Sequence, residues 1–170
     1  MNKSLEVPDH QEAVAPVQSR TQPRQRILVV EDDTIVSQLY SEVLIRHGYQ
    51  VDTAEDGEIG WQALRAVSYA PDSYDLLITD HNMPKMSGVE LIRKVRAAHM
   101  ALPVVMASAL MPPGLEEFQL AAILSKPVHP EELAQTVRTV LQVANNFPNA
   151  NYHSLHRFDE FLQNYHLHLK

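Results

Sequence analysis

The chain has 170 residues and a formal net charge of −7. This charge argues against non-specific binding to nucleic acid, which depends on cationic side chains that neutralise phosphates. The absence of cysteine excludes disulfides, thiolate catalysis and cysteine-ligated zinc. No apolar run approaches the roughly 20 residues that span a bilayer, and the acidic N-terminus lacks the apolar stretch of a secretory signal. We therefore expect a cytoplasmic protein with neither nucleic acid nor a membrane as a partner.

The first predicted strand follows a polar segment over residues 1–25, which we interpret as flexible because it has no sustained apolar period. The strand, over residues 27–30, ends in an acidic triplet. Apolar residues then recur at helical spacing as far as Gly48, which is typical of the glycine that follows a helix. Asp33 or Thr34 is the expected N-cap of this helix.

The alternation of strand and helix continues through the chain. It predicts a parallel sheet covered by helices on both faces, and the uninterrupted apolar runs are typical of strands that are buried on both faces. The further strands are predicted over residues 50–54, 74–79, 103–107 and 121–125, and the further helices over residues 58–67, 87–98 and 130–143.

Two regions depart from this regular pattern. Pro112, Pro113 and Gly114 exclude a regular helix between the fourth and fifth strands, leaving at most about two turns from Leu115. After residue 143 we predict a break over residues 145–151, followed by a tail with one apolar face of the kind that an amphipathic helix has. We thus divide the chain into a flexible segment (1–25), one domain (26–144) and a C-terminal tail (145–170).

Polar residues suited to phosphoryl chemistry stand where four of the predicted strands end. The first is followed by Glu31 and Asp32, and the others by Asp80, Ser108 and Lys126. Ligands of an open parallel sheet bind beyond the carboxyl ends of its strands, so these side chains should converge. Carboxylates would attract Mg²⁺, which prefers oxygen ligands, and a lysine and a hydroxyl would suit a phosphoryl group.

These motifs, in this order, resemble the response-regulator receiver domain of two-component signalling over residues 26–143. They are Val29-Val30-Glu31-Asp32-Asp33, Asp80-His81-Asn82-Met83-Pro84-Lys85-Met86-Ser87-Gly88, Ser108-Ala109 and Lys126-Pro127. The resemblance implies a flavodoxin-like, doubly wound α/β fold with a five-stranded parallel sheet in the order 2-1-3-4-5. The double proline departs from the family and predicts a shortened or irregular fourth helix in that fold.

The resemblance also implies a role for each site residue. Asp80 would be the phospho-acceptor, a carboxylate nucleophile. Glu31, Asp32 and Asp80 would hold Mg²⁺, together with the backbone carbonyl of Asn82. Ser108 would hydrogen-bond the phosphoryl oxygen and Lys126 would pair with it, offsetting the repulsion between two anions.

Smaller expectations concern neighbouring residues. We expect the peptide bond before Pro127 to be cis, Asp33 to be a helix cap rather than a third metal ligand, and His81 to face solvent. Ile123 departs from the family, which usually has an aromatic residue there that rotates inward on phosphorylation. The usual readout of the phosphorylated state is therefore expected to differ in this chain.

The functional prediction is a single-domain response regulator, because no DNA-binding, cyclase, phosphodiesterase or kinase motif follows the receiver. Its partners would be a histidine kinase or phosphotransfer protein and an unidentified downstream protein. It would catalyse only its own aspartyl phosphorylation and dephosphorylation. An alternative is an interaction module that no longer needs phosphate. A phosphate-ester hydrolase is disfavoured, because Asn82 occupies the position where such enzymes keep a second aspartate.

Overall fold

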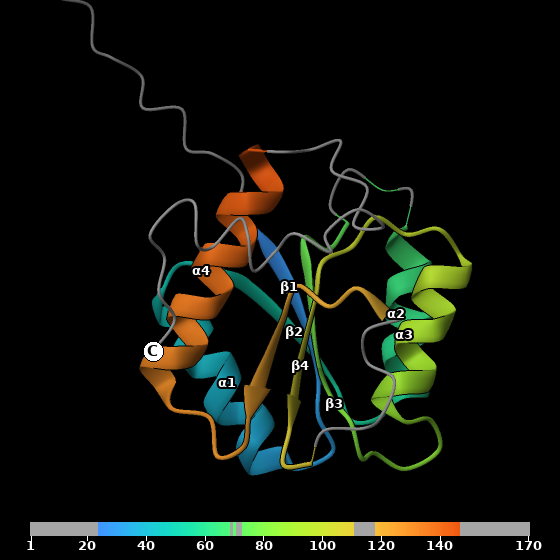
Figure 1. Cartoon of the computed structure of the whole chain (residues 1–170), viewed down its shortest axis with the longest axis horizontal. Helices are drawn as coiled ribbons and strands as arrows, with labels where there is room; N and C mark the ends of the chain where they lie inside the picture. Colours follow the sequence, from blue (N-terminus) through green and yellow to red (C-terminus); the bar gives the residue numbers. More distant parts are fainter. Residues whose placement is uncertain (1–23, 69, 71–72, 111–117, 147–170) are drawn as a thin grey trace, which may run out of the picture.

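The computed structural model describes residues 24–68, 70, 73–110 and 118–146. Five strands and four helices alternate along these residues, except between the last two strands (Figure 1). In chain order they are β1 (Arg26–Val30), α1 (Thr34–Arg46), β2 (Gln50–Ala54), α2 (Gly57–Val67), β3 (Leu76–Asp80), α3 (Gly88–Ala97), β4 (Val104–Ser108), β5 (Ala122–Ser125) and α4 (Pro130–Asn146).

The sheet is parallel throughout and has the order β2-β1-β3-β4-β5, which confirms the predicted order. Because β1 lies beside β3, Val30 pairs with Thr79, and the residues that follow each strand reach the same edge. On the other side of β3, Asp80 pairs with Ala107. The sheet therefore brings residues from distant parts of the sequence to one edge.

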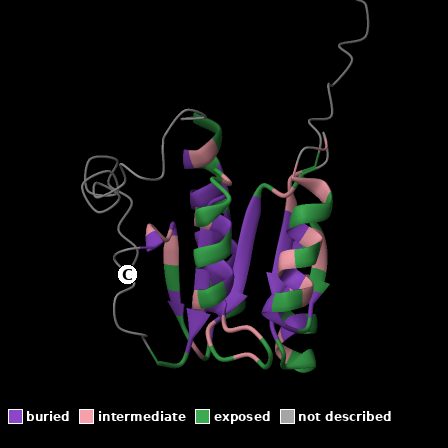
Figure 2. Cartoon of the chain, turned by 90° about the vertical axis from the view of Figure 1, so that its right-hand side faces the viewer, coloured by how far each residue is buried: buried purple, intermediate pink, exposed green. Residues whose placement is uncertain are grey.

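Helices cover both faces of the sheet: α1 and α4 lie on one face and α2 and α3 on the other (Figure 1). Every residue of β3 and β4 is buried, as the purple central strands of Figure 2 show. This double burial explains why the strand sequences are apolar without alternation.

The helix ends follow from specific side chains. An Asp33 oxygen accepts hydrogen bonds from the backbone N–H groups of Ile35 and Val36, so Asp33 and not Thr34 is the N-cap of α1. Gly48 follows that helix with a φ of 92°, a conformation that favours glycine. Ser87 and Glu90 form a reciprocal capping box at the start of α3.

Three expectations from the sequence differ from the structure or lie outside the described residues. Helix α4 runs to Asn146, three residues past its predicted end at residue 143, so the first two residues of the predicted break are helical and the rest of that break lies outside the described residues. In α1, Ile35 and Leu39 follow the helical period but are exposed by 78% and 43%. The short helix predicted from Leu115, between the fourth and fifth strands, begins within residues 111–117, and most of the tail falls on residues 147–170; both ranges lie outside the described residues.

The described end of the β4–β5 connection is attached to α3 by one arginine. The Arg96 guanidinium donates hydrogen bonds to the backbone oxygens of Leu102, Phe118 and Gln119 at 2.9–3.2 Å. The Phe118 ring is buried against the α2–α3 face, and the Arg93 guanidinium lies 5.3 Å from its centroid. Among the described residues, no helix combines the length and apolar character that crossing a bilayer needs.

Candidate phosphoryl-transfer site

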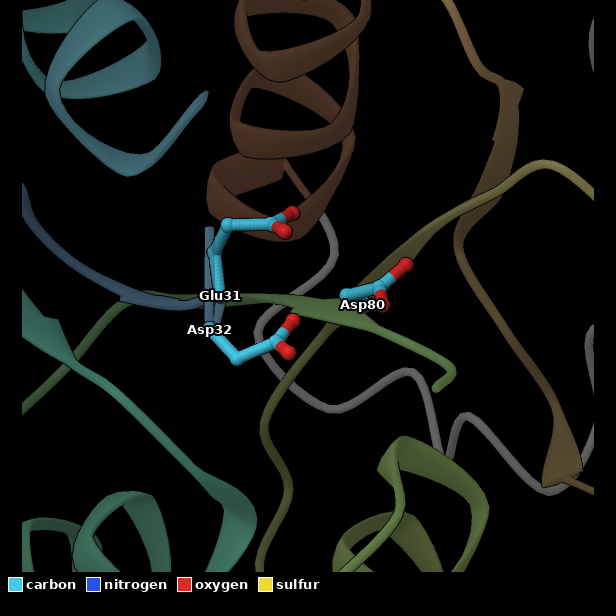
Figure 3. Close-up of side chains that lie close together, drawn as sticks. All are labelled: Glu31, Asp32 and Asp80. Atoms are coloured by element: carbon cyan, nitrogen blue, oxygen red, sulfur yellow. The ribbon is translucent and has the colours of Figure 1, made fainter. Parts of the chain in front are cut away.

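Three carboxylates meet at the carboxyl edge of the sheet. Glu31 and Asp32 follow β1, and Asp80 is the last residue of β3. One ligand atom from each lies within 4.8 Å of those of the other two, and Figure 3 shows the three side chains close together, with those of Glu31 and Asp32 extending toward Asp80. Glu31 and Asp80 are buried whereas Asp32 is exposed, so the cluster opens to solvent on the side of Asp32.

Both oxygens of Asp80 have a polar neighbour. Oδ2 accepts a hydrogen bond from the backbone N–H of Asn82 at 3.0 Å, and Oδ1 lies 2.9 Å from the Lys126 ammonium. The loop that follows is held against the strand, since the Gly88 N–H donates to the His81 carbonyl at 3.0 Å. A Cβ atom at Gly88 would collide with the Asp80 carbonyl, which is why this position requires glycine.

Lys126 joins the end of β5 to the acidic cluster. Its Nζ donates to both carboxylate oxygens of Glu31, at 3.0 and 2.7 Å, and its backbone N–H donates to the Ser108 carbonyl at 3.0 Å. The peptide bond to Pro127 is cis, as expected. The sequence prediction that Lys126 reaches Asp80 therefore agrees with the geometry.

The pKa values of Glu31 and Lys126 depend on burial and on the hydrogen bonds between the two side chains. Burial raises the pKa of Glu31, and the hydrogen bonds from Lys126 offset only part of that effect. Burial also lowers the pKa of Lys126, but its hydrogen bonds to Glu31 and Asp80 outweigh this and leave the pKa above its ordinary value. Lys126 is therefore a cation at neutral pH.

The acidic cluster fits a hard divalent cation. Three carboxylates face a single ammonium, so a cation with oxygen ligands would offset the remaining negative charge. Asp33 is not part of the cluster, because its side chain caps α1. The donor set is thus consistent with the Mg²⁺ site of receiver domains.

Ser108 lies at the same edge of the sheet as the acidic cluster, but its hydroxyl is hydrogen-bonded to another residue. It ends β4, beside the strand that carries Asp80. Its hydroxyl donates to the Leu110 carbonyl at 2.6 Å and accepts from the Leu110 N–H at 3.3 Å.

Sequence reasoning missed or misplaced three residues near this edge. The Lys85 ammonium lies 2.6 Å from the buried carboxylate of Asp56, linking the loops that follow β3 and β2. Asp56 could have been singled out from the sequence, because it stands just before a predicted helix, where aspartate is a common N-cap. His81 does not face solvent as expected: it is half-buried, and its Nδ1 is buried without a hydrogen-bond partner among the described residues.

The comparisons with known proteins agree with this geometry. The family model of the response regulator receiver domain matches residues 27–138, so the chain belongs to that family. Its members are receivers of two-component signalling, a class phosphorylated by histidine kinases, and are not conventional enzymes.

Among curated relatives, the transcriptional regulatory protein RprY of Bacteroides fragilis (strain YCH46) is 35% identical over 121 residues, which cover 69% of this chain and 49% of RprY. The transcriptional regulatory protein CpxR of Escherichia coli (strain K12) is 32% identical over 124 residues, with coverages of 69% and 49%. The chain thus spans about half the length of these relatives.

Solved structures include two similar chains of receiver size. Chemotaxis protein CheY4 of Vibrio cholerae has a TM-score of 0.61 and 30% identity, covering 69% of this chain and 99% of CheY4. Response regulator TrrA of Thermotoga maritima, solved in complex with Mg²⁺ and BeF, has a TM-score of 0.60 and 29% identity, covering 68% of this chain and 98% of TrrA.

Proposed function

We propose that this chain is a single-domain response regulator that accepts a phosphoryl group on Asp80 in a Mg²⁺-dependent reaction. The donor is a histidine kinase or a histidine phosphotransfer protein, met in the cytoplasm. The observation that carries the proposal is the position of Asp80 between two further carboxylates and the Lys126 ammonium.

The residues of the chain divide the work of the reaction. Glu31, Asp32 and Asp80 would hold Mg²⁺, with the Asn82 backbone carbonyl as a further ligand. When bound, the cation neutralises charge on the transferring phosphoryl group. The Asp80 carboxylate oxygen attacks phosphorus: an O–P bond forms, the P–N bond of the phosphohistidine breaks, and its electron pair remains on the imidazole nitrogen.

Lys126 and Ser108 act on the product. The ammonium, already 2.9 Å from Asp80 Oδ1, pairs with a phosphoryl oxygen and stabilises the negative charge there. The Ser108 hydroxyl donates to another phosphoryl oxygen after releasing the Leu110 carbonyl. The signal then passes on by phosphotransfer or by binding a downstream protein.

The alternative is a phosphorylation-independent interaction module with a receiver fold. The observation in its favour is Ile123, which has neither hydroxyl nor ring and is 37% exposed on β5. A side chain of this kind cannot gate the surface in the usual way, although the chemistry around Asp80 does not depend on it.

Incubation with acetyl phosphate and Mg²⁺, followed by intact mass measurement, tests the proposal. We expect a gain of one phosphoryl group that is lost in Asp80→Asn. Asp33→Asn is the matched control, because it neutralises a neighbouring carboxylate that caps α1 and lies outside the cluster. Labelling that persists in Asp80→Asn would move the acceptor elsewhere, and no labelling of the wild type would favour the interaction module.

A further inference from the structure

Tyr40 carries an unused hydroxyl beside the site. The residue lies in the second turn of α1, is 3% exposed, and its hydroxyl has no hydrogen-bond partner among the described residues. A buried polar group without a partner is costly, and such groups in native proteins often have a functional reason. Nothing in the resting arrangement of the site uses this hydroxyl.

Tyr40 packs with Ile27 and Val29 of β1 in the core between α1, α4 and the sheet. Glu31 continues the ladder of β1 through its N–H bond to the Ala54 carbonyl, so by alternation it belongs to the same face as these two residues. Side chains of a helix lean back toward its N-terminus, and α1 begins directly after Asp32 and its cap Asp33. The hydroxyl experiences the charges of Lys126, Glu31, Asp80 and Glu132, in decreasing order of effect. Burial raises the pKa of Tyr40 to about 12, so the hydroxyl is a neutral donor at neutral pH.

Glu31 has no need of this donor in the resting site. The Lys126 ammonium donates to both of its oxygens. Glu31 is also 3% exposed, so water has little access to replace that cation. When Lys126 turns toward a phosphoryl group on Asp80, the Glu31 carboxylate loses both of these hydrogen bonds and keeps the long one, 3.4 Å, that Oε1 accepts from the Asp33 N–H. Its other oxygen is then without a protein donor, which is unfavourable for a buried anion.

We propose that Tyr40 is a positioning residue whose hydroxyl donates to the Glu31 carboxylate once Lys126 has moved to the phosphoryl group. The hydroxyl would hold the Glu31 carboxylate directed toward the cation while the ammonium pairs with the phosphoryl oxygens. This inference rests on the proposed function. It gives helix α1 a role in the phosphorylated state, in addition to the roles of the motifs at the strand ends.

Tyr40→Phe tests the inference, with Tyr74→Phe as the matched control. The Tyr74 hydroxyl already donates to Asp52 at 2.9 Å, in the segment before β3 and so at the opposite edge of the sheet. Thermal unfolding without Mg²⁺ measures the resting state, and calorimetric titration with beryllofluoride and Mg²⁺ measures a phosphoryl mimic. Tyrosine labelled with ¹³C at Cζ reports hydrogen bonding of the hydroxyl directly.

The two variants should behave in opposite ways. Tyr40→Phe should unfold at the same temperature as the wild type or higher, yet bind beryllofluoride about tenfold more weakly, as loss of a hydrogen bond to a charged group implies. Tyr74→Phe should unfold earlier and bind normally. The Cζ resonance that is absent from the Tyr40→Phe spectrum should shift when the wild type binds beryllofluoride.

Other results would overturn the inference. Wild-type affinity in Tyr40→Phe, or an unmoved Cζ resonance, would remove Tyr40 from the phosphorylated site and leave the proposed function intact. Earlier unfolding of Tyr40→Phe would show that the hydroxyl is already bonded at rest. Failure of the wild type itself to bind beryllofluoride would overturn both proposals together.

Discussion

The Ser108 hydroxyl donates to the backbone carbonyl of Leu110 at 2.6 Å, so the side chain belongs to the start of the β4–β5 connection and not to the acidic cluster. One hydroxyl hydrogen cannot serve the Leu110 carbonyl and a phosphoryl oxygen at the same time. The two residues are therefore coupled: a phosphoryl group that draws in Ser108 must release Leu110.

This coupling predicts a specific nuclear magnetic resonance signature. Beryllofluoride with Mg²⁺ should shift the Leu110 amide in the wild type, and Ser108→Ala should reduce that shift severalfold while the mimic still binds. Ser108→Thr, which keeps the hydroxyl, is the control and should retain the shift. An equal shift in Ser108→Ala would show that the change reaches the loop by another route.

Lys126→Met should destabilise the metal-free protein by about 2 kcal/mol, because two buried carboxylates lose their shared cation. Mg²⁺ should recover much of this loss, since it binds the folded state and neutralises the same carboxylates. Chemical denaturation with and without Mg²⁺ measures both effects. If Mg²⁺ stabilises the variant less than it stabilises the wild type, the Lys126 ammonium does not take the place of Mg²⁺ in the metal-free site.

The pair of Asp56 and Lys85 should make stability depend on pH. Hydrogen bonds from the Lys85 ammonium and the Ile59 N–H hold the pKa of Asp56 below its ordinary value. The stabilisation is then complete above the unfolded-state pKa of about 4 and is lost as the pH falls through the lowered folded-state value. Asp56→Asn should be less stable than the wild type at pH 7, with a difference that shrinks below about pH 4.

Lys85→Met provides the control for that measurement. It removes the same ion pair from the other side, so the double variant should lose little more than either single one. Full additivity of the two losses would mean that the carboxylate of Asp56 is stabilised by the helix cap alone.

Arg96→Lys should weaken the attachment of the β4–β5 connection to α3, because a lysine ammonium cannot replace the planar guanidinium that donates to three carbonyl oxygens. We expect a loss of about 1–2 kcal/mol and faster amide exchange at Phe118 and Gln119. Arg93→Lys is the control, since Arg93 lies over the ring of Phe118 and donates none of these three hydrogen bonds. Unchanged exchange in Arg96→Lys would show that burial of Phe118 alone holds the segment.

Much of the site was predictable because the motifs stand at strand ends, and parallel strands bring their carboxyl ends to one edge. The strand order, the acidic cluster and the contact of Lys126 with Asp80 followed from that rule and the resemblance. Side-chain direction did not follow. The Ser108 hydroxyl bonds to Leu110 and the His81 Nδ1 is buried, and neither orientation can be read from the order of the residues.

The end of α4 was missed for a different reason. Asn145 has a low helix propensity, but a helix that already packs its apolar face can extend over one or two unfavourable residues. Tyr40 could be counted as an apolar residue on the inner face of α1, but its hydroxyl becomes informative only when its surroundings are known.

The hydrogen bonds between Lys126 and Glu31 join residues 95 positions apart. A contact of that separation forms only after the chain entropy of a very long loop has been overcome. A fragment that stops before β5 therefore lacks part of the site. During synthesis, the carboxylates after β1 can contact Lys126 only when nearly the whole domain has been made. Competence to accept the phosphoryl group therefore requires that the sheet has folded as far as the end of β5.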